Sequence, residues 1–223
     1  MPRPFAPSAS SVAPDAGFDA VASWYDALAT AVFGRALRRA QQAALVAGLP
    51  DGAPRVLLIG GGTGWVLGQV LQRCPAARVL YLEASGRMLR RSRLWLQRHA
   101  PRHTGQVEFR LGTEQDLAPH EQFDAVVTFF FLDLFPPERL RRIVQRLRAA
   151  QLPGAPWLLA DFGTPRRWWH HGLLGLMYWF FRLTTGIEAQ QRPPIEAELA
   201  AQGLRTTPAG RFFGGIVEAS VWQ

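Results

Sequence analysis

The sequence contains no lysine and no asparagine, so each of its 25 basic residues is an arginine. This bias is typical of GC-rich coding, which raises the arginine content of a protein whatever that protein does. The formal net charge of +8 is therefore weak support for a nucleic-acid partner. The arginines are also spread along predicted helices, as in 87–93 and 139–148, which is typical of solvated helix faces. We expect no nucleic-acid partner.

Cysteine is almost absent, since Cys74 is the only one. A single cysteine excludes an internal disulfide and a cysteine-based zinc site, which fits a cytoplasmic protein. No set of His, Cys, Asp and Glu residues has the spacing of a metal site, so we expect no metal. Residues 1–17 are rich in Pro, Ala and Ser and lack the apolar segment of a secretory signal, so we expect a disordered leader there.

Long apolar runs are missing as well. The strongest candidate is the aromatic-rich run 172–181, about half of the roughly 20 residues that a membrane span needs. Three interpretations stay open. The run is a buried helix packed on the sheet, or the wall of a pocket for an apolar ligand, or a helix on a membrane surface. The membrane contact would then use residues 166–182, which carry arginines near both ends.

Strands and helices alternate along the chain, as judged from apolar runs and from apolar residues at helical spacing. The predicted strands cover 55–59, 78–82, 107–111, 123–130, 157–160, 204–213 and 215–222. The predicted helices cover 18–46, 65–73, 86–99, 136–149, 164–183 and 193–202. This alternation predicts an α/β fold with a parallel sheet covered on both faces. The Gly-Gly turn between the last two strands predicts an antiparallel pair.

Four glycines in five positions (GGGTG) follow the first predicted strand. Such a turn lets the backbone approach a ligand closely, with a helix N-terminus just beyond. A P-loop would need a Lys-Ser/Thr pair next, and Trp-Val follows instead. The dinucleotide fingerprint needs a third glycine, and the two positions for it hold Trp65 and Leu67. The remaining pattern Gly60-x-Gly62-x-Gly64 favours a nucleoside without a pyrophosphate.

One acidic residue, Glu83, ends the second predicted strand. The carboxyl ends of parallel strands meet at one edge of the sheet, so we expect this carboxylate beside the glycine loop. There it can accept hydrogen bonds from both ribose hydroxyls of a nucleoside. An acidic residue after a strand is more often merely solvated, but the glycine loop at this distance favours the ribose role.

With these features the sequence resembles the class I S-adenosylmethionine-dependent methyltransferases, and most nearly the ubiquinone/menaquinone C-methyltransferase-like subgroup. Several segments carry the resemblance in the family's order. They are SWYD at 23–26, LIGGGTG at 58–64, EASGRML at 83–89, VEFRLGTE at 107–114, FDAVV at 123–127 and LPGAPWLLADF at 152–162. Each motif is weak alone, and together they cover the chain from about residue 19 to 162.

The resemblance implies a Rossmann-like three-layer α/β sandwich, with a mostly parallel seven-stranded sheet and an antiparallel C-terminal strand. It implies one domain over 18–223, with an N-terminal helical cap (18–50), a cofactor-binding core (51–163) and a C-terminal helix and β-hairpin on the acceptor side (164–223). The implied cofactor is S-adenosyl-L-methionine. The predicted cofactor contacts are Tyr25, Gly60, Gly62, Thr63, Gly64, Glu83, Ala84, Met88, Gly112, Thr113, Glu114 and Thr128.

Two residues depart from the family's pattern. Leu58 stands where the family usually has a carboxylate that holds the amides of the glycine loop. Thr113 stands where an aspartate often contacts the adenine amino group, and Glu114 is the alternative for that contact. Both departures bear on cofactor affinity, and neither affects the fold.

The cofactor brings its own electrophile, so the protein has to supply binding and alignment rather than a catalytic triad. A phenol or an acidic carbon as acceptor would still gain from a nearby base. Asp133 follows the fourth predicted strand, at the edge where the methyl group should point, and a helix or turn cap is its alternative role. His170 is the second candidate base, and membership of a surface pair with His171 is its alternative.

The sequence therefore predicts a methyltransferase for a small, apolar or aromatic acceptor that is quinone-, phenol- or lipid-like. Three alternatives stay open. A methyltransferase-like domain that binds without catalysis would fit Leu58. An NAD(P)-dependent oxidoreductase lacks its third glycine here, and a chain without lysine has no Tyr-x-x-x-Lys pair. A nucleic-acid methyltransferase normally has Asn/Asp-Pro-Pro-Tyr/Phe where this chain has TFFF at 128–131.

Overall fold

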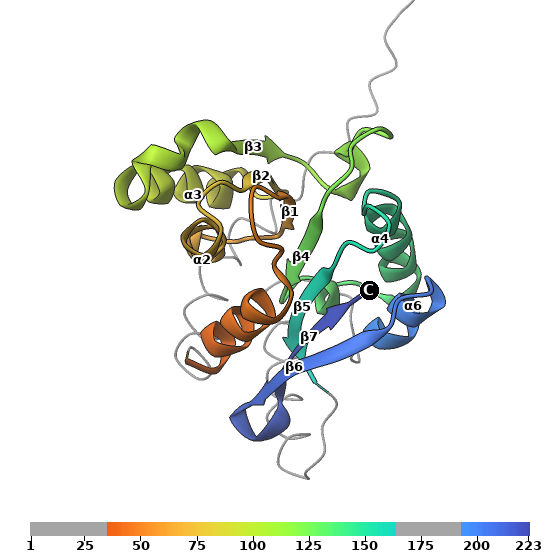
Figure 1. The fold of residues 1–223 in the computed structure, drawn as a ribbon. Coiled ribbons are helices and arrows are strands. Elements are labelled where there is room, and N and C mark those ends of the chain that lie inside the picture. The colour runs from red at the N-terminus through yellow and green to blue at the C-terminus, as the bar shows by residue number, and fades with distance from the viewer. Residues whose placement is uncertain (1–34, 164–192) are drawn as a thin grey trace, which may run out of the picture.

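The computed structural model describes residues 35–163 and 193–223 (Figure 1). The predicted leader, Tyr25, His170 and the aromatic stretch over 166–182 lie outside the described residues. A helix over 35–48 covers the last part of the helix predicted for 18–46. The described residues include the glycine loop and all seven strands.

The seven strands form one sheet in the order β3-β2-β1-β4-β5-β7-β6. Their bounds are β1 Arg55–Ile59, β2 Arg78–Glu83, β3 Val107–Leu111, β4 Ala125–Phe129, β5 Trp157–Phe162, β6 Thr206–Phe212 and β7 Val217–Trp222. The first five strands pair in parallel, and β7 pairs antiparallel with both β5 and β6. The predicted mostly parallel sheet with an antiparallel C-terminal strand is therefore confirmed.

Helices cover both faces of this sheet, which gives the three layers seen in Figure 1. The helix over 35–48, α2 (Trp65–Arg73) and α3 (Gly86–His99) lie on one face. On the other face lie α4 (Pro137–Ala149) and α6 (Ile195–Ala201). Four short 3-10 helices are η1 Pro101–Gln106, η2 Glu114–Asp116, η3 Leu132–Leu134 and η4 Phe213–Gly215.

Each face of the sheet has its own apolar core, because successive side chains of a strand point to opposite faces. Leu58 and Val127 face the core under α2 and α3. Leu57 and Val126 face the core under α4 and α6. The central strands are apolar at nearly every position because both of their faces are covered.

The strand predicted for 123–130 is shorter in the structure, and the reasons are local. At its start, the Asp124 carboxylate accepts a hydrogen bond from the Arg55 main-chain N–H at 2.8 Å. At its end, Phe130 has a φ of 52°, in the left-handed region, which stops the extended conformation. β5 runs two residues further than predicted because its pairing with β7 continues to Phe162.

Candidate cofactor site

The glycine loop leaves β1 and leads into α2 through three residues in the left-handed region. The φ angles are 67° at Gly60, 63° at Gly62 and 98° at Gly64. Residues with a side chain adopt this region at a cost, so the sequence needs glycine at these positions. Gly64 is the N-cap of α2, and no side chain caps the first amides of that helix. Those amides are donors available at the end of the loop.

Two of the glycines are also needed because other side chains lie against them. A Cβ on Gly60 would lie 2.6 Å from the ring of Phe131, and one on Gly61 would lie 2.6 Å from the ring of Tyr81. A Cβ on Gly62 would meet no described atom within 4 Å. The loop is therefore closely packed at Gly60 and Gly61. At Gly62 no described side chain lies against it, and a ligand can approach the backbone there.

The Glu83 carboxylate lies beside this loop, at the carboxyl end of β2. Its Oε2 accepts a hydrogen bond from the Gly62 N–H at 3.3 Å, and its Oε1 accepts one from the Ser85 N–H at 3.0 Å. Glu83 is half-buried. The structure thus brings together the acidic residue and the glycine loop that the sequence predicted as one site.

The segment after Glu83 begins α3 and contains two more predicted contact residues. Ser85 is the N-cap of α3, and its hydroxyl accepts a hydrogen bond from the Met88 N–H at 3.2 Å. Met88 is buried in the first turn of α3, whereas Ala84 is exposed. Their contacts with a cofactor remain predictions.

The predicted residues at the end of β3 lie next to Glu83. The Gly112 N–H donates to the Glu83 main-chain carbonyl at 3.0 Å. Thr113 is the N-cap of η2, and its hydroxyl accepts from the Gln115 N–H at 3.3 Å. Glu114 is buried and lines a hollow of about 400 Å³ beside arginines of α4. The hydroxyl of Thr113 is thus occupied within its own loop.

Two further predicted residues lie at the end of β4 and just beyond it. Thr128 is fully buried, and its hydroxyl accepts a hydrogen bond from the Trp157 indole N–H at 2.8 Å. A cofactor contact from this residue would therefore not use its side chain. Asp133 lies in η3, four residues after β4, and is 5% exposed. Its position beyond the sheet edge is the one that the sequence predicted.

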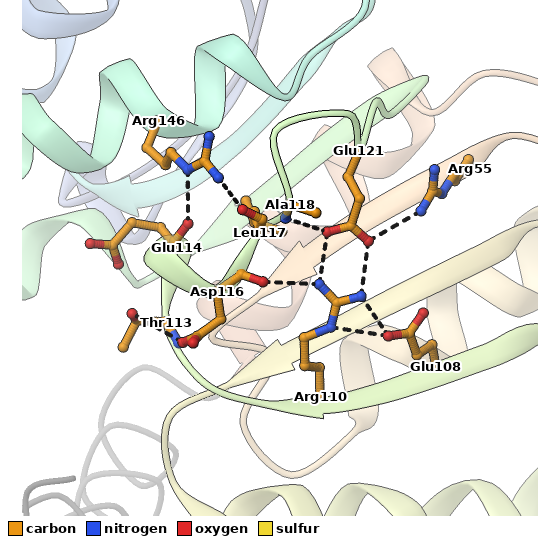
Figure 2. Close-up of polar contacts among 10 residues, drawn as sticks. All are labelled: Arg55, Glu108, Arg110, Thr113, Glu114, Asp116, Leu117, Ala118, Glu121 and Arg146. Carbon is orange, nitrogen blue, oxygen red and sulfur yellow. Dashed lines mark hydrogen bonds and ion pairs between the residues drawn. The ribbon is translucent and has the colours of Figure 1, made fainter. Parts of the chain in front are cut away.

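A network of charged residues fixes the segment 112–124, which joins β3 to β4 with no helix other than η2 (Figure 2). The Glu121 carboxylate accepts from the Arg110 guanidinium at 2.8 and 2.9 Å and from the Ala118 N–H at 2.8 Å. Arg55 adds a longer contact of 3.4 Å. The hydrogen bonds from Arg110 lower the pKa of Glu121 to about 2, although burial opposes this shift. Glu108 binds the other side of Arg110 at 2.6 Å.

Sequence reasoning missed two hydroxyls beneath the glycine loop. Tyr81 and Ser92 both donate to the Gly62 main-chain carbonyl, at 2.9 and 2.7 Å. Tyr81 has a single hydroxyl and stands between leucines of β2, and Ser92 is a small residue in the arginine-rich helix α3. Neither forms part of a recognisable motif. The one available signal is that a tyrosine stands among the aliphatic residues of 79–82.

The sheet order and the glycine loop are those of a Rossmann-like α/β fold. Residues 56–154 match a family model described as a methyltransferase domain. The matched region runs from β1 to the turn before β5, so it contains the glycine loop, Glu83 and Asp133. No curated protein matches the chain in sequence.

Solved structures that share the fold include several methyltransferases. The mitomycin 7-O-methyltransferase MmcR is 23% identical over 85% of this chain and 54% of its own, with a TM-score of 0.65. The DhpI-SAM-HEP complex is 22% identical over 92% of this chain and 94% of its own, with a TM-score of 0.63. RosA from Streptomyces davawensis, an N,N-8-amino-8-demethyl-D-riboflavin dimethyltransferase, is 22% identical over 88% and 56%, with a TM-score of 0.61.

At these identities the likeness shows the fold alone, and the chain spans about half the length of MmcR and RosA. Within residues 35–163 and 193–223, no helix is long and apolar enough to cross a membrane. The same described ranges contain no group of three or more His, Cys, Asp or Glu residues placed to hold a metal.

Proposed function

We propose that the chain is an S-adenosylmethionine-dependent methyltransferase that acts on a small apolar or aromatic acceptor. The position of Glu83 carries this proposal: one oxygen of its carboxylate lies 3.3 Å from the Gly62 amide nitrogen, so the acid and the glycine loop form one surface. The family match over 56–154 supports the same activity. A fold neighbour named as a complex with SAM supports the same cofactor.

The residues at the loop fit this cofactor. The Glu83 carboxylate lies at the loop, with one oxygen on the Gly62 N–H and the other on the Ser85 N–H. Carboxylate oxygens are the acceptors that ribose hydroxyls need. No described atom lies within 4 Å of a Cβ position on Gly62, and no side chain caps the start of α2, so the rest of the nucleoside would lie there. When bound, S-adenosylmethionine supplies the electrophile, a methyl group on a sulfonium.

Asp133 is the base that we propose within the described residues. A phenol has a pKa of about 10, so a carboxylate beside it would assist removal of its proton during transfer. The buried position of Asp133 beyond β4 keeps it out of bulk water. His170, the acceptor side over 164–223 and membrane contact through 166–182 stay predictions from the sequence.

The names of the fold neighbours bear on the acceptor atom. MmcR is named as a 7-O-methyltransferase of mitomycin. RosA is named as a dimethyltransferase of an amino-riboflavin. A third neighbour is an O-methyltransferase family 2 protein in complex with apigenin. These names favour an oxygen or nitrogen acceptor over the quinone carbon of the subgroup that the sequence most nearly resembles. Quinone C-methylation is the second candidate.

Calorimetric titration with S-adenosylmethionine, S-adenosylhomocysteine and NADH tests the cofactor. We expect both sulfur nucleosides to bind and NADH not to bind. Tight binding of NADH, with none of either sulfur nucleoside, would overturn the proposal in favour of an oxidoreductase. Incubation with radiolabelled methyl donor and a panel of quinols, phenols, amines and phospholipids then identifies the acceptor. Cofactor binding without transfer to any of them would favour a protein that binds without catalysis.

The variant Glu83→Gln tests the role of the carboxylate. It keeps the shape of the side chain and removes the charge that strengthens hydrogen bonds to the ribose. We expect the Kd of S-adenosylhomocysteine to rise about tenfold or more, since a hydrogen bond to a charged group contributes about 1.5–3 kcal/mol. Glu138→Gln, on the exposed first turn of α4, is the matched control and should leave the Kd unchanged. An unchanged Kd in Glu83→Gln would refute the ribose role.

A further inference from the structure

The main-chain carbonyl of Gly62 is held by two side-chain hydroxyls from below the glycine loop. The Tyr81 hydroxyl donates to it at 2.9 Å and the Ser92 hydroxyl at 2.7 Å. The two hydroxyl oxygens are 2.9 Å apart, and Ser92 also lies 3.0 Å from the Met88 carbonyl. The loop is thereby linked to β2 through Tyr81 and to α3 through Ser92.

Both hydroxyl-bearing residues are fully buried, at 0% exposure. In such an environment a hydrogen bond is stronger than in water, and an unpaired polar group costs more. The Tyr81 ring is fixed by packing, because it lies under Gly61 and contacts Phe109 at 5.3 Å between ring centroids. The hydroxyls therefore meet the loop in one fixed geometry.

Gly62 is held on both sides by these contacts. Its N–H donates to Glu83, its carbonyl accepts from the two hydroxyls, and its φ of 63° lies in the left-handed region. A glycine would otherwise populate many conformations, since it has the least restricted backbone of all residues. The hydrogen bonds select the one conformation in which Gly62 faces open space beside the Glu83 carboxylate.

The register of the sheet shows that β1 supplies no polar side chain beside Tyr81. Leu58 of β1 pairs with Tyr81 of β2, and both face the same core. Leu58 is 1% exposed and has no polar atom in its side chain. The polar group nearest the loop on this face is thus on the neighbouring strand.

We propose that Tyr81 and Ser92 are positioning residues that hold Gly62 in the cofactor-binding conformation through its main-chain carbonyl. The proposal rests on the proposed function for its ligand, S-adenosylmethionine or its homocysteine analogue. Without the two hydroxyls the loop would populate other conformations, and the apparent Kd would rise in inverse proportion to the remaining fraction of the binding-competent one.

The test uses the full chain with Tyr81→Phe, Ser92→Ala and the double variant. Tyr81→Phe keeps the buried ring, and Ser92→Ala removes one oxygen, so each single variant retains the packing. Two readouts are measured: the Kd of S-adenosylhomocysteine, and hydrogen exchange of the ligand-free protein in peptides that contain residues 60–64. The exchange readout reports on the Gly62 N–H, which donates a hydrogen bond to the Glu83 carboxylate. This measurement needs no ligand.

We expect each single variant to raise the Kd about fivefold and the double variant at least about fiftyfold, with faster exchange at 60–64 in all three. The double effect exceeds the product of the single effects because each single variant still leaves one hydroxyl on the Gly62 carbonyl. Ser220→Ala is the matched control: it removes a hydroxyl that accepts from the Trp222 indole at 3.0 Å on β7, and should change neither readout.

The outcomes separate this inference from the proposed function. If the wild-type chain binds neither sulfur nucleoside, the proposed function fails, while exchange at 60–64 still tests the anchoring of the loop. Unchanged exchange in the folded single variants would overturn the anchoring. Faster exchange with an unchanged Kd would overturn the positioning role, because the loop would then be free without consequence for the ligand.

Discussion

Two loops at the sheet are held in place by different sets of side chains. The Gly62 carbonyl of the glycine loop is held by the hydroxyls of Tyr81 and Ser92, on the face covered by α2 and α3, and the Gly62 N–H is held by the Glu83 carboxylate. The segment 112–124 is fixed on the other face by charge, through Arg110 and Glu121. A hydroxyl hydrogen bond involves no ionised group, whereas an ion pair depends on the charge of its carboxylate and therefore on pH.

The difference follows from what covers each loop. The glycine loop is packed against α2 and α3, so apolar contacts and two hydroxyls are enough. The segment 112–124 buries two apolar side chains, Leu117 and Phe123, and residues 118–122 between them lie in no helix or strand. Ionic contacts around Glu121, which is 6% exposed, hold these residues. We therefore expect the two regions to respond separately to mutation and to acid.

Arg110→Met gives the largest expected effect. It leaves the Glu121 carboxylate buried with only the longer 3.4 Å contact to Arg55 and the Ala118 N–H. Removal of one partner from a buried ion pair costs about 3 kcal/mol of unfolding free energy at neutral pH. Urea denaturation measures this loss, and exchange at 60–64 should stay at the wild-type rate because the glycine loop has its own supports.

The matched control for that variant is Arg211→Met. Arg211 pairs with Glu218 at 3.2 Å, and its side chain is 55% exposed. An exposed ion pair contributes less than about 1 kcal/mol, so the control should lose far less stability. If Arg110→Met and Arg211→Met cost the same, the charge network does not hold the segment 112–124. If Arg110→Met also accelerates exchange at 60–64, the two regions are not independent.

The second largest expected effect is a loss of unfolding free energy in acid, through protonation of Glu121. The pKa of Glu121 is lowered from 4.5 to about 2 in the folded protein. Its contribution is therefore complete above about pH 4.5 and is lost as the pH falls towards 2, where the folded carboxyl is protonated. At pH 3 the loss amounts to about 2 kcal/mol.

Urea denaturation of the wild type and of Glu121→Gln across this pH range measures that contribution. The glutamine variant cannot titrate at position 121, so it should start less stable at neutral pH and lose less stability in acid. Parallel curves for the two proteins between pH 4.5 and 2 would show that Glu121 does not have a lowered pKa.

These two regions also show how far the sequence could predict the molecule. The glycine loop and Glu83 were predictable because each follows a strand whose apolar pattern is local, and parallel strands bring their carboxyl ends to one edge. The contact of Tyr81 with Gly62 joins residues 19 positions apart through one hydroxyl, and no periodic pattern records such a contact. The partners of Glu121 come from three separate segments, for the same reason.

The end of β4 is a further example of what local patterns do not contain. The apolar run over 123–130 favours a longer strand, and nothing in the residue type of Phe130 indicates a left-handed φ. That conformation is set by tertiary packing, since Phe130 lies against Phe162 of β5 at 5.4 Å between ring centroids. Phe131 follows directly, and its ring lies against Gly60 of the glycine loop.

Two N-caps, one in each region, give the smallest expected effects and sharpen the comparison most directly. Ser85→Ala removes the hydroxyl that accepts from Met88 N–H at the start of α3, which should cost about 1 kcal/mol of unfolding free energy. Thr113→Ala removes the corresponding hydroxyl of η2 and should cost less, about 0.5 kcal/mol, because that helix has only three residues.

Urea denaturation at neutral pH compares the two caps on one scale. An equal or larger loss for Thr113→Ala would mean that η2 depends on its hydroxyl cap and not on the carboxylates around it. The smaller loss for Thr113→Ala is expected because η2 has three residues, whereas the Ser85 hydroxyl caps the 14 residues of α3. Hydroxyl deletions should therefore be costlier beside the glycine loop than beside Glu121.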